Sequence, residues 1–318
     1  MQALPNRPRC LSIPMSASII IPAHNEGRNI ANLLQSLSAD IASGVRVILV
    51  ANGCRDDTAV RARTFEGVEV VEINEASKIA ALRFGDLLAG DDFPRLYVDA
   101  DIVVSPGSVA ALVGQLESAT ARAVAPEICF DQTGASLLVR GYYEFRRRHP
   151  LTEPWRVTHL AGRRIYGTNR AGRDRFGVFP ELINDDGFFD QLFSNVERRI
   201  VHEARVTTSL SRTVSGEIRR LVRVRRGNIE LDAWFRETST SRPDRENISA
   251  PSGCLLGRMA RRIVRSGLVR DPSPLIGFYA ICYGVISWRV AWTIRKQIRD
   301  GASVDWGAKV FSGSLPRD

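Results

Sequence analysis

Two carboxylates stand at alternate positions directly after an apolar segment of the chain, at Asp99 and Asp101. The segment before them, residues 96–98, reads Leu-Tyr-Val and is typical of a buried strand. If the chain turns at the end of such a strand, both carboxylates can point at one position. Two hard oxygen ligands suit Mg²⁺ or Mn²⁺, which then keeps its other coordination positions for water and diphosphate oxygens. An Asp-x-Asp pair also occurs by chance in many loops, so its meaning depends on the elements that position it.

Polar residues follow two earlier apolar segments in the same way. Residues 18–21 (SIII) are followed by residues 22–26 (PAHNE), and residues 46–50 (RVILV) by residues 51–58 (ANGCRDDT). Ligands of open α/β sheets sit beyond the carboxyl ends of the strands, so these positions indicate one sheet edge where a nucleotide can lie. The chain has no Gly-x-Gly-x-x-Gly after the first strand, which disfavours a Rossmann dinucleotide fold, and it has no P-loop motif.

The elements that must position these residues alternate between strand-like and helix-like patterns. Strands are predicted over residues 18–22, 46–50, 68–72, 95–98 and 121–125, and helices over 27–38, 56–64, 77–89 and 106–117. In the last of these helices, Pro106 fits the first turn and Ser105 fits the N-cap. Strands that alternate with helices form βαβ units, so we predict an α/β fold with a mostly parallel sheet flanked by helices.

The composition of the 318-residue chain is that of a globular protein, with 44% hydrophobic and 25% charged residues. These fractions exclude a disordered or fibrous chain. Five widely spaced cysteines without a Cys-x-x-Cys pair argue against a disulfide framework and a zinc knuckle, and for a reducing compartment. The net charge of +9 fits nucleic acid, an anionic membrane surface or a phosphorylated small molecule, and does not choose among them.

An apolar segment near the C-terminus, from Leu275 to Trp288, carries no charge before Arg289. A membrane-spanning helix needs about 20 apolar residues, which is more than this segment offers. The pattern therefore favours a buried helix, or an amphipathic helix on a membrane surface, over a true span. We predict a cytoplasmic protein and leave open a peripheral contact with the inner face of the cell membrane.

Six short motifs occur along the chain in a characteristic order and spacing. They are residues 18–26 (SIIIPAHNE), 52–58 (NGCRDDT), 77–85 (SKIAALRFG), 97–101 (YVDAD), 184–186 (NDD) and 223–228 (RVRRGN). Together they resemble the motifs of the inverting family 2 glycosyltransferases, which have the GT-A fold. The resemblance implies a GT-A-like catalytic domain over residues 16–230. Around it we expect a disordered leader (1–15), a polar linker (231–253) and a helical C-terminal extension (254–318).

The resemblance implies that residues from the first two loops frame the nucleobase and the ribose. These residues are Pro22, Ala23, Asn25, Glu26 and Asn52. A second interpretation of Glu26 is a carboxylate that interacts favourably with a helix N-terminus, and both can hold together. Lys78, one of only three lysines in the chain, either contacts the nucleotide or its phosphates or lies on a solvated helix face.

The resemblance also implies where a metal ion and the diphosphate bind. Asp101 is the main expected ligand of Mg²⁺ or Mn²⁺, while Asp99 contacts the ribose, or the metal through water. The metal would act as a Lewis acid on the departing diphosphate. Arg223, Arg225 and Arg226 would add forked hydrogen bonds to that diphosphate, or else lie on a solvated or membrane-facing side of a helix.

The motif at residues 184–186 resembles the acidic pair that holds the catalytic base. An inverting transfer needs one carboxylate to take the proton of the acceptor hydroxyl opposite the leaving group, and we assign this role to Asp186. Asp185 beside it, with Phe188 and Phe189, would raise its pKa toward the working pH. The alternative is that Asn184 or Asp185 only caps a helix.

Some residues depart from the family pattern. Asn52 stands where an aspartate is common, so a hydrogen bond to the base or ribose remains possible but a negative charge is lost. Arg83 stands where asparagine is frequent, and the sequence offers no explanation for it. The late basic motif lacks the Gln-x-x-Arg-Trp form of processive synthases, which favours a single transfer over polymerisation.

The sequence therefore predicts a metal-dependent inverting glycosyltransferase that moves one sugar from a nucleotide-sugar, most often a UDP-sugar in this family, to a hydroxyl acceptor. A glycan, a lipid or a small molecule are all candidate acceptors, and the apolar C-terminal segment favours a lipid or a lipid-linked glycan of the cell envelope. The alternatives are a sugar nucleotidyltransferase and a basic nucleic-acid-binding protein, although we expect no nucleic-acid partner. The oligomeric state stays open.

Overall fold

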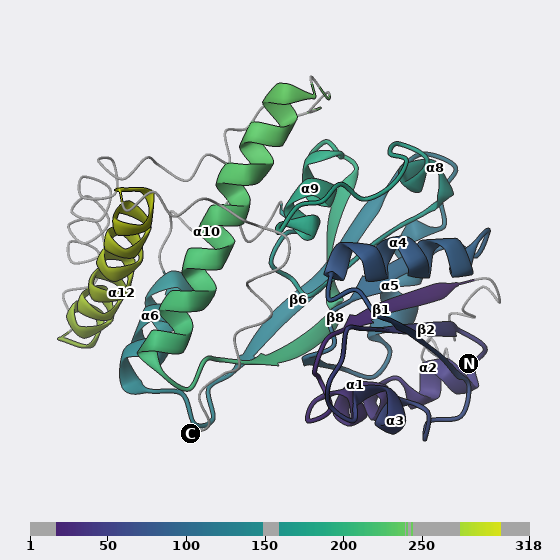
Figure 1. Ribbon diagram of the computed structural model, residues 1–318, viewed down its shortest axis with the longest axis horizontal. Coiled ribbons are helices and arrows are strands. Elements are labelled where there is room, and N and C mark those ends of the chain that lie inside the picture. The colour runs from purple at the N-terminus through teal and green to yellow at the C-terminus, as the bar shows by residue number, and fades with distance from the viewer. Residues whose placement is uncertain (1–16, 149–158, 239, 241–242, 244–273, 300–318) are drawn as a thin grey trace, which may run out of the picture.

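The computed structural model describes residues 17–148, 159–238, 240, 243 and 274–299, which form one eight-stranded sheet with helices on both faces (Figure 1). The strand order is β3-β2-β1-β4-β7-β6-β8-β5. The predicted α/β fold is confirmed. The sheet is mixed, however, because parallel and antiparallel pairs both occur in it.

The first half of the sheet is parallel, as predicted. It consists of β1 (Ser18–Ala23), β2 (Arg46–Asn52), β3 (Val68–Ile73) and β4 (Arg95–Val98). β1 pairs in parallel with both β2 and β4, and β2 pairs in parallel with β3. The carboxyl ends of these strands therefore meet at one edge, which is the edge that carries the polar residues of the sequence motifs.

The second half of the sheet reverses direction. Its strands are β5 (Ile102–Val104), β6 (Ala123–Asp131), β7 (Ile165–Thr168) and β8 (Arg198–Ser209). β7 lies between β4 and β6 and is antiparallel to both, whereas β6 and β8 are parallel. The sequence prediction missed β5, β7 and β8. β5 and β7 are three and four residues long, too short to show a period of two clearly.

Helices cover both faces of the parallel half. α4 (Lys78–Ala89) packs on β1 and β2, and the opposite face carries α1 (Ile30–Ser36), α2 (Ser38–Ala42) and α3 (Thr58–Ala62) (Figure 1). α5 (Ser108–Leu116) packs on β8 and β6 of the second half and joins the same buried core as α1 and α3. Alternate residues of β1 face the two layers: Ile19 and Ile21 join the core on the α1 side, and Ile20 joins the core on the α4 side. This alternation produces a three-layer fold.

Two predicted helices differ from the structure. The predicted helix over residues 27–38 begins later, at Ile30, and a second short helix follows it from Ser38. The helix predicted from Pro106 begins at Ser108, and its N-cap is Gly107 with φ 77° rather than Ser105. A left-handed residue suits glycine because glycine has no Cβ, and the sequence pattern for Ser and Pro at a helix start did not reveal it.

Four further helices follow the parallel half: α6 (Leu137–Arg148), α8 (Arg170–Arg173), α9 (Asp185–Gln191) and α10 (Val214–Glu237). The domain boundary predicted at residue 230 falls inside α10. Leu231 and Phe235, which lie beyond that boundary, are buried in the core, and Phe235 stacks on Phe188 of α9 with ring centroids 6.1 Å apart. Residues 231–237 therefore belong to the folded domain.

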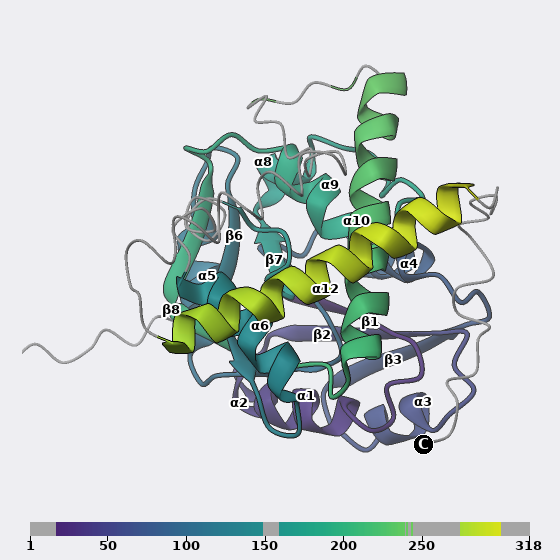
Figure 2. The same ribbon diagram turned by 90° about the vertical axis from the view of Figure 1, so that its left-hand side faces the viewer.

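The apolar C-terminal segment forms α12 (Pro274–Arg299), which packs against α6 and α10 (Figure 2). Val139 of α6, Val222 of α10 and Ile286 of α12 share one buried cluster. Among the described residues, no helix is long and apolar enough to cross a membrane. The predictions for residues 1–15, 254–273 and 300–318 lie outside the described residues.

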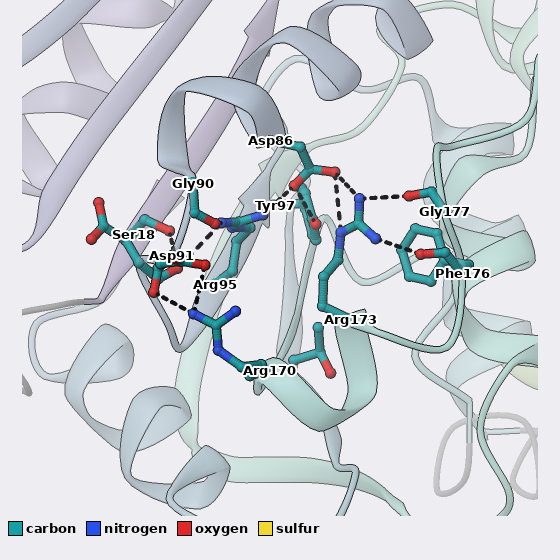
Figure 3. A network of polar contacts seen from close by, with 12 residues as sticks. Ser18, Asp86, Gly90, Asp91, Arg95, Tyr97, Arg170, Arg173, Phe176 and Gly177 are labelled. Carbon is teal, nitrogen blue, oxygen red and sulfur yellow. Dashed lines mark hydrogen bonds and ion pairs between the residues drawn. The ribbon is translucent and has the colours of Figure 1, made fainter.

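A buried polar network fixes α4 to the sheet (Figure 3). Asp86 of α4 accepts hydrogen bonds from Arg95 Nη1 at 2.8 Å, from the Tyr97 hydroxyl at 2.8 Å and from Arg173 Nη2 at 2.9 Å. Arg95 and Tyr97 belong to β4, and Arg173 ends α8. Because buried charges are stable only when they are paired, this network restricts the position of α4 and of the residue that begins it, Lys78.

Candidate active site

The loops after β1 and β2 are held against each other by hydrogen bonds. Asn25 has a left-handed backbone with φ 54°. Its side-chain Oδ1 accepts a bond from the Arg55 N–H at 2.8 Å, and its own N–H points at Cys54 Sγ at 3.4 Å. His24 Nδ1 lies 2.5 Å from the carbonyl oxygen of Asn52. The structure therefore brings the predicted nucleotide-binding loops together, with Asn25 as the residue that joins them.

Glu26 follows in the same loop and lies close to the metal motif. Its backbone N–H donates to Thr58 Oγ1 at 2.8 Å, which fixes the loop to the start of α3. Burial raises the pKa of the Glu26 carboxyl, a hydrogen bond from Asn29 lowers it, and the charges of Asp101 and Asp99 raise it further. The carboxylate of Glu26 thus lies in the electrostatic field of the Asp-x-Asp pair.

The remaining predicted nucleotide-site residues of the first two loops are buried at the strand ends. Pro22 and Ala23 end β1, and Asn52 ends β2 with only 3% of its surface exposed. The side-chain Oδ1 of Asn52 is buried and has no hydrogen-bond partner within the described part of the chain. An unsatisfied buried acceptor costs about 1–3 kcal/mol, so a ligand that donates a hydrogen bond here would remove that cost.

The carboxylates of Asp99 and Asp101 converge on one guanidinium group. Arg164 Nη1 lies 3.3 Å from Asp99 Oδ2 and 3.4 Å from Asp101 Oδ2. Arg164 precedes β7, has φ 68°, and accepts a hydrogen bond from the Asp99 N–H at its carbonyl oxygen. The sequence analysis missed Arg164, because nothing in its local pattern distinguishes it from the many other arginines of this chain.

The two carboxylates fit a divalent cation that completes its coordination from outside the protein. Both carboxylates already contact one atom, Arg164 Nη1, so one metal ion near that position can contact both. The side chain of Asp101 is 37% exposed and leaves room for water or diphosphate oxygens. Within the described ranges, no group of three or more His, Cys, Asp or Glu side chains gathers into a closed metal site. Such a cation would have to share Asp99 and Asp101 with Arg164 or displace it.

Lys78 connects the two acidic motifs. It begins α4 after the N-cap Ser77, and its Nζ lies 2.8 Å from Asp99 Oδ1 and 3.0 Å from Asp185 Oδ2. Burial would lower the pKa of Lys78, but the carboxylates of Asp185, Asp99 and Asp186 outweigh burial and raise it. Lys78 therefore stays charged, and the interpretation of Lys78 as a residue of a solvated helix face is wrong.

The pairing has the opposite effect on Asp99. Burial would raise the pKa of this carboxyl, but the charges and hydrogen bonds of Lys78 and Arg164 lower it to about 2. Asp99 is consequently ionised at any working pH, and both of its oxygens already have cationic partners.

Asp185 is held from two sides. Its side chain is 5% exposed, and its Oδ2 accepts a hydrogen bond from the Tyr166 hydroxyl at 2.8 Å as well as contacting Lys78. Tyr166 belongs to β7 and stacks on Tyr97 of β4 with ring centroids 5.1 Å apart. These contacts fix the side chain of Asp185 and with it the start of α9.

Asp186, the next residue, has a different environment. Its oxygens accept hydrogen bonds from the backbone N–H groups of Gly162 at 2.5 Å and Gly187 at 2.9 Å. Burial and the charge of Asp185 raise the pKa of Asp186 to about 6, against the opposing effects of Lys78 and the Gly162 N–H. A carboxylate with a pKa just below neutrality is suited to accept a proton.

Asn184 caps the helix that carries the acidic pair. Its Oδ1 accepts a hydrogen bond from the Gly187 N–H at 3.0 Å, so the capping interpretation of Asn184 is confirmed. Capping and a catalytic role for Asp186 do not exclude each other. Asn184 is also where α10 comes close, because a Cβ on Gly227 would lie 3.1 Å from the Cβ of Asn184.

Arg83, which had no explanation from the sequence, holds the segment that leads to α9. Its Nε donates to the carbonyl oxygen of Phe179 at 2.7 Å, and its Nη1 pairs with Glu181 at 2.5 Å. Since Arg83 lies on α4, the same helix positions both Lys78 and the chain that approaches Asp185.

The arginines of α10 do not act as one cluster. Arg223 is exposed, whereas Arg225 is half-buried beside Tyr142 of α6 and Tyr283 of α12. Gly227, which packs on Asn184, lies on another side of α10, because residues two apart on a helix are separated by about 200°. The structure thus turns Arg225 away from the acidic motifs, contrary to the prediction that it joins Arg223 and Arg226 at the diphosphate.

Another arginine of α10, Arg220, acts electrostatically on Arg164. Burial lowers the pKa of Arg164, the carboxylates of Asp101 and Asp99 raise it, and the positive charge of Arg220 lowers it, with a raised pKa as the net result. Arg220 also donates to the Tyr143 hydroxyl at 2.7 Å and pairs with Glu217 at 2.7 Å. The sequence analysis did not single it out, because its place on the helix face depends on how α10 packs.

The first half of the chain matches the family model described as glycosyl transferase family 2, over residues 18–176. This match covers half of the 318 residues and includes β1 to β7, and therefore both nucleotide loops, Lys78 and the Asp-x-Asp pair. A search of curated proteins finds no match to this sequence.

Solved structures with a similar fold include a mannosyltransferase from Pyrobaculum calidifontis in complex with GDP-mannose and Mn²⁺. It is 16% identical, with a TM-score of 0.46, over 95% of this chain and 76% of that chain. Glucosyl-3-phosphoglycerate synthase from Mycobacterium tuberculosis, in complex with Mn²⁺ and UDP-glucose, is 19% identical, with a TM-score of 0.42, over 81% and 79% of the two chains. Its complex with Mn²⁺, UDP and glucosyl-3-phosphoglycerate is 21% identical, with a TM-score of 0.42, over 61% and 70%.

Proposed function

The chain belongs to glycosyl transferase family 2 and is a glycosyltransferase, and we propose that it moves one sugar from a nucleotide-sugar to a hydroxyl acceptor with inversion at the anomeric carbon. The observation that carries this proposal is the contact of Lys78 with both Asp99 and Asp185. This contact places the Asp-x-Asp motif and the acidic pair beside each other at one edge of the sheet. Family membership also decides between the two enzyme classes, against a sugar nucleotidyltransferase.

Asp186 is the proposed general base. It would accept the proton of the acceptor hydroxyl while the hydroxyl oxygen forms a bond to the anomeric carbon and the nucleoside diphosphate leaves from the opposite side. The backbone N–H groups of Gly162 and Gly187 orient its carboxylate. Asp185 has its own fixed partners, Lys78 and Tyr166, and acts by raising the pKa of Asp186.

Asp101, with Asp99 as a second contact, would hold Mg²⁺ or Mn²⁺ at the diphosphate. Within the described residues Asp101 pairs with Arg164 alone, whereas Asp99 also pairs with Lys78, which supports the partly exposed Asp101 carboxylate as the main ligand. Bound there, the metal would stabilise the negative charge that develops on the leaving diphosphate. Arg164 and the exposed Arg223 are available to donate hydrogen bonds to the same phosphates.

The nucleobase would bind between the loops of Asn25 and Asn52. The buried Oδ1 of Asn52 fits an N–H donor, which both uracil and guanine present at a ring nitrogen. We keep a UDP-sugar as the proposed donor. The proposed acceptor is a lipid or lipid-linked glycan, reached at the inner face of the cell membrane, with a small-molecule hydroxyl as the alternative.

Nucleotide binding provides the direct test of this proposal. We expect UDP with Mn²⁺ to raise the melting temperature of the protein clearly more than UDP alone, since a ligand at about 100 times its Kd stabilises the folded state by about 2.7 kcal/mol. Asp101→Asn should lose the part of the shift that requires Mn²⁺. The matched control is Asp91→Asn, an exposed carboxylate whose loss should leave the shift unchanged. A stronger shift with GDP would reassign the base, and no shift with any nucleoside diphosphate would contradict the proposal.

The rate of transfer should depend on pH through Asp186. Because the base acts only when it is deprotonated, kcat/KM for the acceptor should rise about tenfold per pH unit below a pH of about 6 and level off above it. Steady-state rates measured under constant ionic strength would show this limb. A rate that is constant down to the pH where ordinary aspartates titrate would argue against Asp186 as the base.

A further inference from the structure

An unbroken apolar stripe runs along the outer side of α12. Its members are Phe278 (42% exposed), Ile281 (64%), Val285 (42%), Trp288 (62%) and Trp292 (46%). They are spaced by three and four residues, so they lie on one side of the helix. The other side is buried against α6 and α10 through residues such as Ile286 and Val290. Single exposed apolar residues are ordinary, but a contiguous patch of this kind marks an interaction surface.

The helices around the stripe carry an unusual charge. α6, α10 and α12 together contain fourteen Arg and Lys residues and five Asp and Glu residues. Their nine excess positive charges equal the net charge of the whole chain, so the remainder of the chain is balanced. α12 itself contains four cations and no acidic residue. The occupant of this surface must therefore be apolar and negatively charged at the same time.

We propose that the outer side of α12, together with the cations beside it (Arg289 and Lys296 of α12 and Arg148 of α6, which lies over Tyr279), is a docking surface for an anionic lipid bilayer. In this arrangement α12 lies in the plane of the membrane, with the stripe inserted among the lipid headgroups and upper acyl chains. Trp288 and Trp292 suit this depth, because tryptophan prefers the boundary between apolar and polar layers. Figure 2 shows α12 exposed along its length on the outside of the molecule.

The cations at the C-terminal end of α12 are placed to meet lipid phosphates. Arg289 and Lys296 both lie over the ring of Trp292, at 5.5 Å and 5.6 Å from its centroid. Arginine and lysine side chains beside an inserted apolar stripe can extend their charged ends back to the headgroups. The stripe and these cations therefore form one surface with two kinds of contact.

A second copy of the chain fits this surface less well. The spacing of the stripe resembles a coiled-coil seam, in which charged residues beside the seam pair between the two helices. α12 has no acidic residue that could pair with Arg289 or Lys296 of a second α12. Two such surfaces would instead bring their positive charges together, which opposes association.

The position of the surface relates it to the active site. α10 contacts α12 on one side and, through Gly227, Asn184 on another. A bilayer bound to the outer side of α12 would thus be separated from the start of α9 by α12 and α10, which is about two helix diameters, roughly 20 Å. The docking surface does not depend on the reaction proposed for the acidic motifs, and it can be tested without substrate.

Vesicle binding of the full chain tests this proposal. We expect the protein to sediment with vesicles that contain phosphatidylglycerol and far less with vesicles of phosphatidylcholine alone, and we expect added salt to weaken binding. The double variant Trp288→Ser/Trp292→Ser should bind at least about tenfold more weakly. The matched control, Leu87→Ser/Val196→Ser, removes two apolar residues that are 74% and 77% exposed elsewhere and should bind like the parent.

Three results would overturn the proposal. The first is equal vesicle binding by the tryptophan variant and the parent, and the second is binding without a preference for anionic vesicles. The third is a dimer in solution that the tryptophan substitutions dissociate, because this result would assign the stripe to a second copy of the chain. Thermal unfolding of both variants shows whether they are folded. Arg289→Gln/Lys296→Gln, which keeps the stripe, should reduce the salt dependence of binding and still bind more than the tryptophan variant. Nucleotide-induced stabilisation of the same variants reports on the active site separately.

Discussion

Replacing Asp186 by asparagine is expected to lower the rate of sugar transfer by about 10²–10⁴-fold and to leave nucleotide binding intact. Asparagine has nearly the shape of aspartate, and its Oδ1 can still accept the hydrogen bond that Gly162 donates to Asp186. It cannot accept a proton from the acceptor hydroxyl. The loss should therefore appear in kcat, measured with saturating donor, while the melting-temperature shift caused by UDP with Mn²⁺ stays close to that of the parent.

The same substitution should make the protein more stable near neutral pH. The folded structure raises the pKa of Asp186 to about 6 from an ordinary value of 3.8, so ionisation of this carboxyl opposes folding as the pH rises through that window. One pKa unit corresponds to about 1.4 kcal/mol, and Asp186 is only half-buried, so we expect a gain of about 1–2 kcal/mol in the free energy of unfolding. Urea denaturation of both proteins at about pH 8 measures it, and the gain should vanish at about pH 4.

The neighbouring substitution Asp185→Asn serves as the matched control. It removes the buried carboxylate that faces Lys78, so it should destabilise the protein instead of stabilising it. An Asp186→Asn protein that retains transfer within tenfold of the parent (about 1.4 kcal/mol) would show that another group takes the proton. Loss of nucleotide binding in Asp186→Asn would place this residue at the donor instead.

Replacing Lys78 by methionine is expected to reduce both stability and activity, because it removes the cation between the two acidic motifs. Removing one partner of a buried ion pair costs about 3–5 kcal/mol, and we expect about 2–3 kcal/mol here since the Lys78 side chain is 35% exposed. The lysine also lowers the pKa of Asp186, so without it the acid limb of the pH–rate profile should move to higher pH. Urea denaturation and the pH dependence of kcat/KM measure the two effects.

A surface ion pair provides the control for Lys78. Arg63 and Glu72 lie 2.7 Å apart with side chains that are 50% and 54% exposed, so Arg63→Met should change the free energy of unfolding by less than about 1 kcal/mol. The conservative change Lys78→Arg should keep part of the stability. If Lys78→Met were as stable as the parent and had the same pH profile, the contact between the acidic motifs would have no energetic importance.

The parallel half of the fold could be predicted from the sequence because its signals are local. β1, β2 and β4 are short, mostly apolar segments, each followed by polar residues, and a parallel βαβ arrangement brings those ends to one edge without knowledge of any distant contact. The assignment of Asp99 and Asp101 to that edge follows from the same rule. β7 could not be predicted in this way, since it pairs with β4 across more than sixty intervening residues and has little periodic pattern.

The interactions among the site residues needed three dimensions. The sequence identified Lys78 as unusual but not its two carboxylate partners, which come from β4 and α9. It contained no signal for Arg164, and it grouped Arg225 with Arg223 because they lie two residues apart in one basic motif. On a helix, residues two apart point in different directions, and only the packing of α10 against α9 and α12 determines which of them faces the acidic motifs.

Chain-local information was thus sufficient for the family and the class of the fold, while Asp101 as a metal ligand and Asp186 as the base stay predictions. The difference between Asp185 and Asp186 came from the folded molecule. The two are neighbours of the same type, but Asp185 is paired with Lys78 and Tyr166, while Asp186 is half-buried and has a raised pKa. The pKa of a carboxyl depends on its burial and on charges from elements far apart in the sequence. In the same way, which side of α12 is buried and which is exposed depends on the helices packed against it.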